Sequence, residues 1–491
     1  MRIDVPPFEQ LFGAFRVLPP DAVAQIHQGA LQTLESVGVR FDEPLARRCL
    51  QKAGATVEGD LVRFPGELIE EALKRRAETV VLGAKVERAD LELGRHRFLT
   101  TNGFGTTRIL DPISGESRDA TAEDLARLTR LADALEEVSY CQHQTTPADL
   151  PENLLDVALA FIVLANTSKH AHLSMYSARH ADAVIEMGSI AGDHRGGTSP
   201  PVFSLGCCSI SPLRFPAEAT ALMRNAVRKK IPFLIVSGAV VGVMAPVTMA
   251  GALVVQTAEH LAALTLAQFE APGAPVVFGS FASPMDPRDG RQRLGAAELP
   301  LLNGATANLC ELYGVPLGYG TGGGTGSSRI GVQAGVEKAI TTIAAALAGV
   351  EVIHGACAGI LDSGQTVCYE QMIIDAEVCK TTRRYLRGID ISSRTLALEV
   401  ISDVGPGGNF LTSLHTARNF REAILMSELW RGRGSGNTEG AVEVARGRVA
   451  ELLSADVEQP LTKDQADQMI SIWERVGLDA RLARVLLPGG G

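Results

Sequence analysis

Ala274-Pro-Val-Val-Phe-Gly279 is a short run of apolar and β-branched residues that directly follows a long helical pattern, Pro246–Glu270. A continuous apolar run of this length is typical of a strand that is buried on both faces of a parallel sheet. Pro201-Val-Phe-Ser-Leu-Gly206 has the same character and precedes a second helical pattern, Pro216–Lys229. These stretches predict strands that alternate with helices.

The same rhythm extends over most of the chain. Further strand-like runs lie at Val138–Thr145, Lys169–Met175, Pro232–Ser237, Val315–Gly320 and Glu351–His354, with an eighth at Arg97–Thr101. Helical patterns such as Gln333–Leu347 separate them. Eight units with a spacing of roughly 30–40 residues fit a closed (β/α)8 barrel better than an open sheet. We therefore predict an α/β protein whose main body is a TIM-type barrel.

Helical segments flank the predicted barrel, which occupies residues 96–372. Residues 1–95 contain amphipathic patterns at Pro44–Ala53 and from Pro65 to about Arg76, and are predicted to pack on the barrel as an N-terminal helical segment. Residues 373–491 are again mainly helical and form a C-terminal segment. The predicted helices of this segment are Thr395–Ile401, Ala417–Ser427 and Val442–Leu453.

Composition excludes several classes of protein. The chain has 491 residues, 46% of them hydrophobic, and a net charge of −10 that argues against binding nucleic acid. Met1–Gln10 lacks the apolar core of a signal peptide, and the apolar stretch Val240–Leu266 contains Glu259 and His260, which disfavour a membrane span. Eight cysteines without disulfide or zinc-finger spacing indicate reduced thiols. We expect a cytoplasmic protein.

Polar and aromatic side chains gather where the predicted strands end. In a (β/α)8 barrel, catalytic residues come from the carboxyl ends of the strands and from the loops that follow them. This pattern indicates an enzyme, although polar residues are also common in loops that have no catalytic role. The strand-end residues are Gln142, His143, Ser174–Tyr176, Cys207–Ser209, Ser237, Gly279–Phe281, Tyr319, Thr321 and His354.

Two familiar motifs are only partly present. Gly318–Gly326 contains a G-x-G-x-x-G pattern after a strand, but the acidic residue that a dinucleotide site needs at the end of the next strand is missing, because Glu351 opens that strand. Such a glycine-rich loop is instead interpreted as one that approaches a bulky ligand or partner. His170 and His172 share one strand face, which leaves a zinc site as an alternative, although no carboxylate or Cys-x-x-Cys motif accompanies them.

Several segments, taken together, resemble the trimethylamine:corrinoid methyltransferase superfamily. They follow the order of that family from about residue 20 to about residue 460, although none of them alone defines a mechanism. They are Leu34-Glu-Ser-Val-Gly-Val39, Thr167-Ser-Lys-His170, Ser211-Pro-Leu213, Ala245-Pro-Val-Thr-Met-Ala-Gly251, Met285-Asp-Pro-Arg-Asp-Gly290, Gln333-Ala-Gly-Val-Glu337, Glu370-Gln-Met-Ile-Ile-Asp375 and His415-Thr416.

The resemblance includes one departure. The trimethylamine enzymes carry pyrrolysine in the loop that here is Gly355–Gly364, and the equivalent position lies near Gly359–Leu361, where no side chain can imitate its imine. The chain therefore resembles the pyrrolysine-free branch, which includes glycine betaine:corrinoid methyltransferases. A quaternary amine already carries the positive charge that makes its nitrogen a leaving group, so this chemistry tolerates the loss.

The resemblance implies methyl transfer from a small quaternary or related amine to Co(I) of a corrinoid that a partner protein presents, with no tightly bound metal in this chain. His354 is the predicted catalytic residue. The predicted substrate-binding residues are the aromatic side chains of Phe104, Tyr176, Phe281 and Tyr319, which would face a cation, and Gln142 and His143, which would bind a carboxylate.

The predicted docking loops for the corrinoid protein are Gly318–Gly326 and Gly355–Gly364, and the predicted cofactor-binding residues in them are Gly320, Gly322, Gly323 and Gly359. We also expect a homo-oligomer, because barrels of this size with added helical segments often dimerise, and most soluble oligomers are symmetric. Two alternatives stay open at this point: zinc-dependent methyl transfer to a corrinoid, and a barrel without catalytic activity that binds betaine-like solutes.

Overall fold

The computed structural model describes residues 9–111, 114–193, 199–430, 440–455 and 459–489. The first eight residues of the predicted N-terminal segment therefore lie outside the described residues. Eight parallel strands form one sheet in the order β6-β18-β17-β15-β13-β11-β10-β9. Their bounds are β6 Leu99–Thr100, β9 Cys141–Gln142, β10 Ala171–Ser174, β11 Phe203–Cys208, β13 Phe233–Ser237, β15 Val276–Ser280, β17 Leu317–Thr321 and β18 Val352–His354.

The sheet closes into a barrel. A parallel bridge between Thr101 and Tyr140 joins the two end strands, β6 and β9. A helix follows each strand before the next one begins, so that the sequence order is also the spatial order, as in a (β/α)8 barrel. The helices are α4 Ala122–Ala134, α5 Leu155–Asn166, α6 Ala181–Gly192, α7 Ala217–Arg228, α8 Met249–Glu270, α9 Glu298–Tyr313, α10 Val332–Leu347 and α11 Tyr369–Leu386. The predicted fold class is confirmed.

The N-terminal segment contains strands as well as the predicted helices. It consists of α1 Pro20–Ser36, β1 Val39–Phe41, α2 Pro44–Ala53, β2 Thr56–Glu58, β3 Leu61–Arg63, α3 Gly66–Arg75, β4 Val80–Leu82 and β5 Leu91–Leu93. The antiparallel pair β4–β5 places Val80, Leu82 and Leu93 in one apolar cluster with barrel residues such as Leu234 and Val277. This hairpin therefore contributes to the interior of the barrel.

The longest apolar stretch of the sequence forms most of helix α8, which is part of the wall of the barrel. It is the one described helix that is long and apolar enough to cross a membrane, but 72% of its most apolar window is buried within the protein. It contacts α1, α3 and α9. The carboxylate of Glu259 and the imidazole of His260 on this helix are buried and bind groups at the barrel strands.

Short strands lie at the carboxyl end of the barrel and pair loops that are far apart in the sequence. The strands β7 Arg108–Leu110 and β8 Ser117–Asp119, which follow β6, form a four-stranded sheet with β19 Ile360–Leu361 and β20 Thr366–Val367, which follow β18. The remaining strands are β12 Arg214–Phe215, which pairs with β1, and β14 Val240–Val241, which pairs with β16 Ser283–Pro284. The loops at this end of the barrel are therefore joined to one another by backbone hydrogen bonds between these strands.

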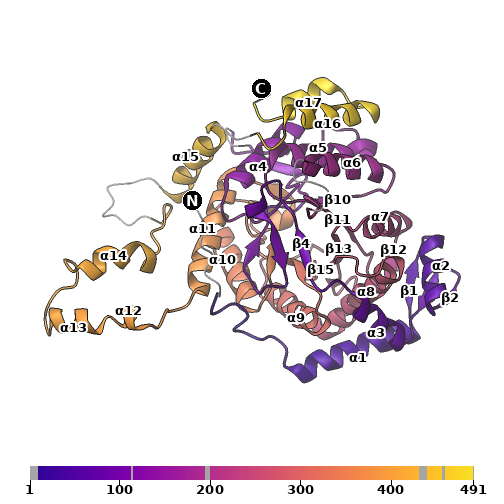
Figure 1. Ribbon diagram of the computed structural model, residues 1–491, viewed down its shortest axis with the longest axis horizontal. Coiled ribbons are helices and arrows are strands. Elements are labelled where there is room, and N and C mark those ends of the chain that lie inside the picture. The colour runs from indigo at the N-terminus through magenta and orange to yellow at the C-terminus, as the bar shows by residue number, and fades with distance from the viewer. Residues whose placement is uncertain (1–8, 112–113, 194–198, 431–439, 456–458, 490–491) are drawn as a thin grey trace.

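The C-terminal helices divide into two groups. Helices α15 Ala441–Ser454, α16 Lys463–Arg475 and α17 Ala480–Leu486 pack on the barrel helices α4, α5, α6 and α11. Helices α12 Ser393–Leu396, α13 Leu398–Val404 and α14 Leu414–Ala423 project away from the barrel (Figure 1) and contain no buried residue. The boundary predicted between residues 372 and 373 falls within α11.

Candidate active site

A cavity of about 270 Å³ lies at the carboxyl ends of β10 and β11. Ligands bind at this end of a (β/α)8 barrel, and ligand sites in proteins typically combine apolar walls with a few converging polar groups. No lysine or arginine is among the described residues that line the cavity. Those residues are His172, Ser174, Met175, Tyr176, Ser177, Gly206, Cys207, Cys208, Pro216, Glu218, Ala219, Leu222, Val236 and Tyr319.

His172 of β10 and His170, the residue directly before this strand, share one hydroxyl group. The Nε2 atom of His170 lies 2.9 Å from Ser204 Oγ on β11, and the Nδ1 atom of His172 lies 3.0 Å from the same oxygen. The Nδ1 atom of His170 lies 2.7 Å from the carbonyl oxygen of Gly83, next to β4. A Cβ atom at Gly206 would lie only 2.7 Å from Cε1 of His172, so glycine leaves room for this ring.

Hydrogen bonds continue from His172 toward the next strand. Its Nε2 atom lies 3.2 Å from Ser174 Oγ, and the Nε2 amide of Gln142 donates to the same hydroxyl over 3.2 Å. The other amide atom of Gln142, Oε1, is buried and has no hydrogen-bond partner among the described residues. Six groups from Gly83 to Gln142 thus form one continuous chain through the barrel.

The histidines near the cavity are neutral at neutral pH. Burial, together with the neighbouring histidines His170 and His143, lowers the pKa of His172 to about 3. Burial also lowers the pKa of His143 to about 4 and holds the pKa of His354 well below its usual range. Because none of these rings is protonated, they do not repel a cation at this end of the barrel.

Aromatic rings stack beside the cavity. The rings of Tyr319 and His354 lie 3.5 Å apart between centroids and 21° from parallel, and the ring of Phe104 covers His354 at 5.7 Å. Phe281 packs against Phe104 at 5.4 Å. Tyr319 lines the cavity, whereas His354 is fully buried against the ring of Tyr319. Both ring nitrogens of His354 lack a hydrogen-bond partner in the described part of the chain.

The two thiols in the cavity wall are poor nucleophiles. Desolvation by the surrounding cavity wall raises the pKa of the Cys208 thiol to about 11, although this residue is exposed at the end of β11, and burial raises the pKa of Cys207 further above the usual range of a thiol. The thiolate is the reactive form of cysteine, and at neutral pH both groups stay protonated. The carboxylate of Glu218, at the rim, accepts hydrogen bonds from Ala178 N and Ser177 Oγ.

Glu259 of α8 holds the loops that surround the cavity. This fully buried carboxylate accepts hydrogen bonds from Ser209 Oγ at 2.6 Å, Ser211 Oγ at 2.9 Å, Ser237 Oγ at 2.6 Å and Leu213 N at 2.8 Å. A buried carboxylate without a paired cation needs such a set of donors. Glu259 therefore ties the loop after β11 to the end of β13, a role that the sequence pattern of α8 does not indicate.

The predicted substrate-binding residues occupy different depths. Tyr176 and Tyr319 line the cavity. Gln142 is one hydrogen bond away from the cavity, through Ser174, and His143 packs edge-on against Tyr176 at 6.5 Å. The other two, Phe104 and Phe281, form a ring cluster beside Tyr319 together with His354, the predicted catalytic residue. The sequence pattern offered His172 only for an alternative zinc site and missed it as a cavity residue, although its strand position could have indicated an inward orientation.

The four predicted cofactor-binding glycines are buried against the chain itself. A Cβ atom at Gly320 would lie 2.3 Å from a methyl carbon of Val350, and one at Gly322 would lie 2.4 Å from Ile353. Gly323 and Gly359 have positive φ angles and equally close neighbours, at Ala356 Cα and at the carbonyl oxygen of Cys368. The close approach that these glycines allow is therefore between protein segments.

The two predicted docking loops lie side by side. The amides of Asp362 and Ser363 donate to the carbonyl oxygens of Ser327 and Thr325, at 2.7 and 2.9 Å. Beneath them, the fully buried Lys338 and Asp375 form an ion pair at 3.0 Å between α10 and α11.

Each partner of this ion pair also holds one of the two loops. Lys338 donates to the carbonyl oxygen of Gly323, and Asp375 accepts from Gly359 N at 2.9 Å. The carboxylate of Glu337, next to Lys338, accepts from Thr325 Oγ and Gly326 N. Two of these residues, Glu337 and Asp375, belong to segments that carry the family resemblance.

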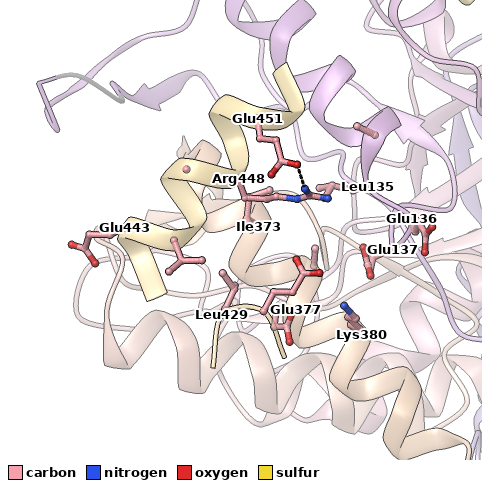
Figure 2. A pocket seen from close by; sticks show the side chains of 15 residues that line it. Leu135, Glu136, Glu137, Ile373, Glu377, Lys380, Leu429, Glu443, Arg448 and Glu451 are labelled. Carbon is pink, nitrogen blue, oxygen red and sulfur yellow. Dashed lines mark ion pairs between the residues drawn. The ribbon is translucent and has the colours of Figure 1, made fainter. Parts of the chain in front are cut away.

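A second cavity of about 600 Å³ lies outside the barrel, between α4, α11 and α15. Figure 2 shows that glutamates dominate its lining, with Lys380 at one end and an ion pair between Arg448 and Glu451 at 2.7 Å. Its lining residues come from these helices, from the loop residues 135–137 after α4, and from Glu428 and Leu429, and none comes from a barrel strand. Among the residues that the structure describes, no group of three or more His, Cys, Asp or Glu side chains could hold a metal ion.

The closed barrel and the cavity at the carboxyl ends of its strands define a (β/α)8-barrel protein whose cavity lies where ligands bind in this fold. The trimethylamine methyltransferase (MTTB) family model matches residues 2–475, and the chain belongs to this family of transferases.

Relatives and a solved structure agree with this assignment. Trimethylamine methyltransferase MttB of Desulfitobacterium hafniense is 30% identical over 94% of each chain. Glycine betaine methyltransferase of the same species is also 30% identical, over 86% of this chain and 88% of its own. The solved hydroxylamine complex of MtmB is similar in fold, with a TM-score of 0.50, 15% identity and coverage of 92% and 90% of the two chains.

Proposed function

We propose that this protein transfers a methyl group from a quaternary or related small methylated amine, of the betaine type, to Co(I) of a corrinoid that a partner protein carries. The names of the relatives supply the reaction class, since they include methyltransferases for trimethylamine and for glycine betaine. The corrinoid is treated as the methyl-accepting substrate. A cytoplasmic location is part of this proposal, because Co(I) requires a reducing compartment.

The observation that carries the proposal is the character of the cavity wall. Tyr319 and Tyr176 contribute aromatic faces, His172 is neutral, and Glu218 adds one negative charge at the rim. These groups suit a methylammonium cation, which aromatic faces bind through their quadrupoles. The protonated thiols of Cys207 and Cys208 supply no nucleophile. The attacking atom is therefore expected to arrive with the second substrate.

The balanced reaction breaks one C–N bond and forms one Co–C bond. The electron pair of the C–N bond stays on nitrogen, which leaves as a neutral amine, and the new bond uses the electron pair of Co(I). The residues of this chain hold one N-methyl group toward the opening and exclude water, because alignment and desolvation of the reacting atoms lower the barrier. Tyr319 and His172 form the walls that fix the cation.

A quaternary substrate agrees with the structure at the position that pyrrolysine takes in the trimethylamine enzymes. Ile360 and Leu361 are fully buried in β19, which pairs with β20, and Gly359 is packed against Cys368. These side chains cannot activate an amine. The substrate therefore needs to bring its own positive charge to nitrogen.

The corrinoid protein is proposed to dock over the joined loops Gly318–Gly326 and Gly355–Gly364. Gly326 is exposed at their edge, whereas Gly320, Gly322, Gly323 and Gly359 shape the loops from within. In this proposal the glycines act on the corrinoid indirectly, because they allow two loops to form one surface. His354 is proposed to position Tyr319, against which it stacks, and its unpartnered ring nitrogens are available to a ligand only if the ring cluster opens.

Replacing Tyr319 by leucine should weaken the binding of tetramethylammonium roughly 2- to 30-fold, which corresponds to the cation–π energy of a single ring. Tyr319→Phe keeps the ring and should bind within about twofold of the wild type. Tyr385→Leu, at an exposed tyrosine of α11 outside the cavity, is the matched control. Isothermal titration calorimetry measures all four proteins. Equal affinities of the wild type and Tyr319→Leu for tetramethylammonium would contradict binding of the cation in this cavity.

Methyl transfer itself is tested by demethylation of a donor panel. Glycine betaine, tetramethylammonium and trimethylamine are incubated with the protein and chemically reduced cobalamin, and the demethylated amines are quantified. We expect turnover with a quaternary donor and little with trimethylamine. Tight binding of a donor without any demethylation would instead support the solute-binding barrel, and activity that follows stoichiometric zinc would support the zinc-dependent reaction.

A further inference from the structure

Each group in the hydrogen-bond chain through the barrel can act as donor or acceptor in only one way, which gives the chain a single direction. A backbone carbonyl at one end of the chain fixes these roles. The oxygen of Gly83 can only accept, so Nδ1 of His170 carries a hydrogen and donates to it over 2.7 Å. Burial lowers the pKa of His170 to about 4, and the ring is therefore neutral with a lone pair on Nε2. The hydroxyl of Ser204 must donate to that lone pair, over 2.9 Å.

The donors and acceptors next to the cavity are fixed in the same way. Ser204 has a single hydroxyl hydrogen, which it donates to His170, so its oxygen accepts a hydrogen bond from Nδ1 of His172. His172 is also neutral, and its Nε2 atom accepts the hydrogen of Ser174. Ser174 in turn accepts from the amide of Gln142, whose Oε1 is left without a partner among the described residues. No hydrogen on Ser174 or His172 remains for a ligand.

We propose that this one-way chain leaves the β10 wall of the cavity without a free donor, with the second lone pair of Ser174 Oγ as its acceptor, and that this wall selects the methylammonium end of the substrate. Polarised C–H groups of a methylated ammonium are donors and fit such a wall, whereas a carboxylate finds no donor on it. This inference deepens the proposed function and rests on it for the nature of the ligand. Gly83 and Ser204 act through His172, and they are positioning residues.

The proposal revises one expectation from the sequence. Gln142 was expected to donate to a carboxylate, but it does not line the cavity, and its amide nitrogen donates one of its two hydrogens to Ser174. The carboxylate of a betaine should therefore lie away from β10, on the side of the cavity where the hydroxyl of Tyr319 can donate. Burial raises the pKa of Tyr319 well above its usual value, so this hydroxyl keeps its hydrogen at neutral pH.

The tautomers of the two histidines test the direction of the chain without any substrate. In protein labelled with ¹⁵N-histidine, long-range ¹H–¹⁵N correlation spectra at neutral pH should show both His170 and His172 protonated on Nδ1. Assignments come from His170→Asn and His172→Asn. In Ser204→Ala, His170 should keep Nδ1–H because Gly83 still accepts, whereas His172 should change to Nε2–H. Ser189→Ala, which removes a hydroxyl bound within α6, is the control and should change neither.

Ligand binding supplies the second readout. Ser204→Ala should bind tetramethylammonium roughly 2- to 10-fold more weakly, the effect of one misdirected hydrogen bond, while its melting temperature shows whether it folds. Protonation of His172 on Nε2 in the wild type, or an unchanged His172 in Ser204→Ala, would overturn the proposal. If the tautomers are as expected but no methylated amine is demethylated, the proposed function fails while the directed chain stands.

Residues 387–430, here called the arm, contain α12, α13 and α14. Twelve of the 28 large hydrophobic side chains that are exposed in the described chain belong to these 44 residues. They are Ile389, Ile391, Leu396, Leu398, Ile401, Phe410, Leu411, Leu414, Phe420, Ile424, Met426 and Trp430. A soluble protein rarely exposes such a group unless another surface covers it.

The exposed area of the arm is that of a stable interface. A large side chain can bury roughly 150–250 Å², so twelve that are about half exposed present roughly 1,000 Å². A standard interface buries about 800 Å² on each partner. On the barrel, Val332, Val336 and Ile340 form an exposed apolar stripe along α10, beside the helix from which the arm departs. We infer that the arm of one copy packs on the α10 stripe of a second copy, in a symmetric dimer.

Light scattering coupled to gel filtration tests this dimer. The wild type should be a dimer, and both Leu398→Glu in the arm and Val336→Glu on α10 should shift it to a monomer at micromolar concentration. Val485→Glu, at an exposed residue of α17, should leave the dimer intact. A monomeric wild type would overturn the inference, and so would a dimer that Leu398→Glu or Val336→Glu does not weaken, because the arm then serves another partner or its own barrel.

Discussion

Replacing Lys338 by alanine is expected to lower the free energy of unfolding by about 3–5 kcal/mol, because it leaves a buried carboxylate without its cation. Lys338 and Asp375 are each 1% exposed and lie 3.0 Å apart. Burial already raises the pKa of Asp375 to about 6, even though Lys338 favours the charged form. Without Lys338, the pKa should rise further, and the carboxyl group should be protonated at neutral pH. Urea denaturation followed by circular dichroism measures the loss.

An exposed ion pair is the control for Lys338→Ala. Arg475 and Glu186 are paired with exposed fractions of 57% and 46%, and Arg475→Ala should cost no more than about 1 kcal/mol. Methyl transfer should also fall in Lys338→Ala, because Gly323 and Gly359 lose their common anchor. A destabilisation of Lys338→Ala no greater than that of Arg475→Ala would show that the ion pair does not hold the two loops.

Acid is expected to destabilise the protein steeply through its buried neutral histidines. The pKa values of His143, His170 and His260 are lowered to about 4 and that of His172 to about 3, in each case mainly by burial. In the unfolded chain these groups have a pKa near 6.5. The unfolded state therefore binds more protons below that value, and stability falls as the pH drops from about 6.5 toward 4, by about 1.4 kcal/mol per pH unit for each histidine.

His260→Gln isolates one such contribution. His260 stacks on Phe278 at 4.5 Å, and its Nε2 atom is 2.8 Å from the carbonyl oxygen of Gly279, to which glutamine can also donate. The stability lost between pH 6.5 and pH 4 should be smaller in His260→Gln than in the wild type by about 3 kcal/mol. Asp375, whose pKa is raised, acts in the opposite direction in both proteins and cancels in the comparison. Identical pH profiles would mean that His260 is not buried in its neutral form.

The barrel could be predicted from the sequence because its strands are fully buried and carry unbroken apolar runs. Phe233–Ser237 lies within a predicted run and Val276–Ser280 extends one residue beyond another, and a helix follows each strand. The β4–β5 hairpin could not be predicted, because three-residue strands such as Val80–Leu82 have no measurable alternation. Its place inside the barrel depends on tertiary packing against distant residues.

The site was predictable as a region and less so as a set of side chains. Strand ends located Tyr319 and Tyr176 at the cavity, but the direction of each side chain depends on register, and β15 shifts register against β17 between Phe278 and Gly279. His354 ends the last strand as predicted and is nevertheless buried behind Tyr319. The hydrogen-bond chain was not predictable, because it requires a carbonyl from residue 83 to meet a histidine at residue 170.

Transfer of a labelled methyl group tests the central claim most directly. Glycine betaine whose three N-methyl groups are all CD₃ is mixed with the protein and a reduced corrinoid, which is either free cobalamin or the corrinoid protein encoded by the nearest gene, and the products are analysed by mass spectrometry. We predict CD₃ bound to cobalt together with an equal amount of dimethylglycine. Unlabelled cobalt and intact betaine, with Co(I) present throughout by its absorbance and with other methylated amines equally inert, would contradict the account.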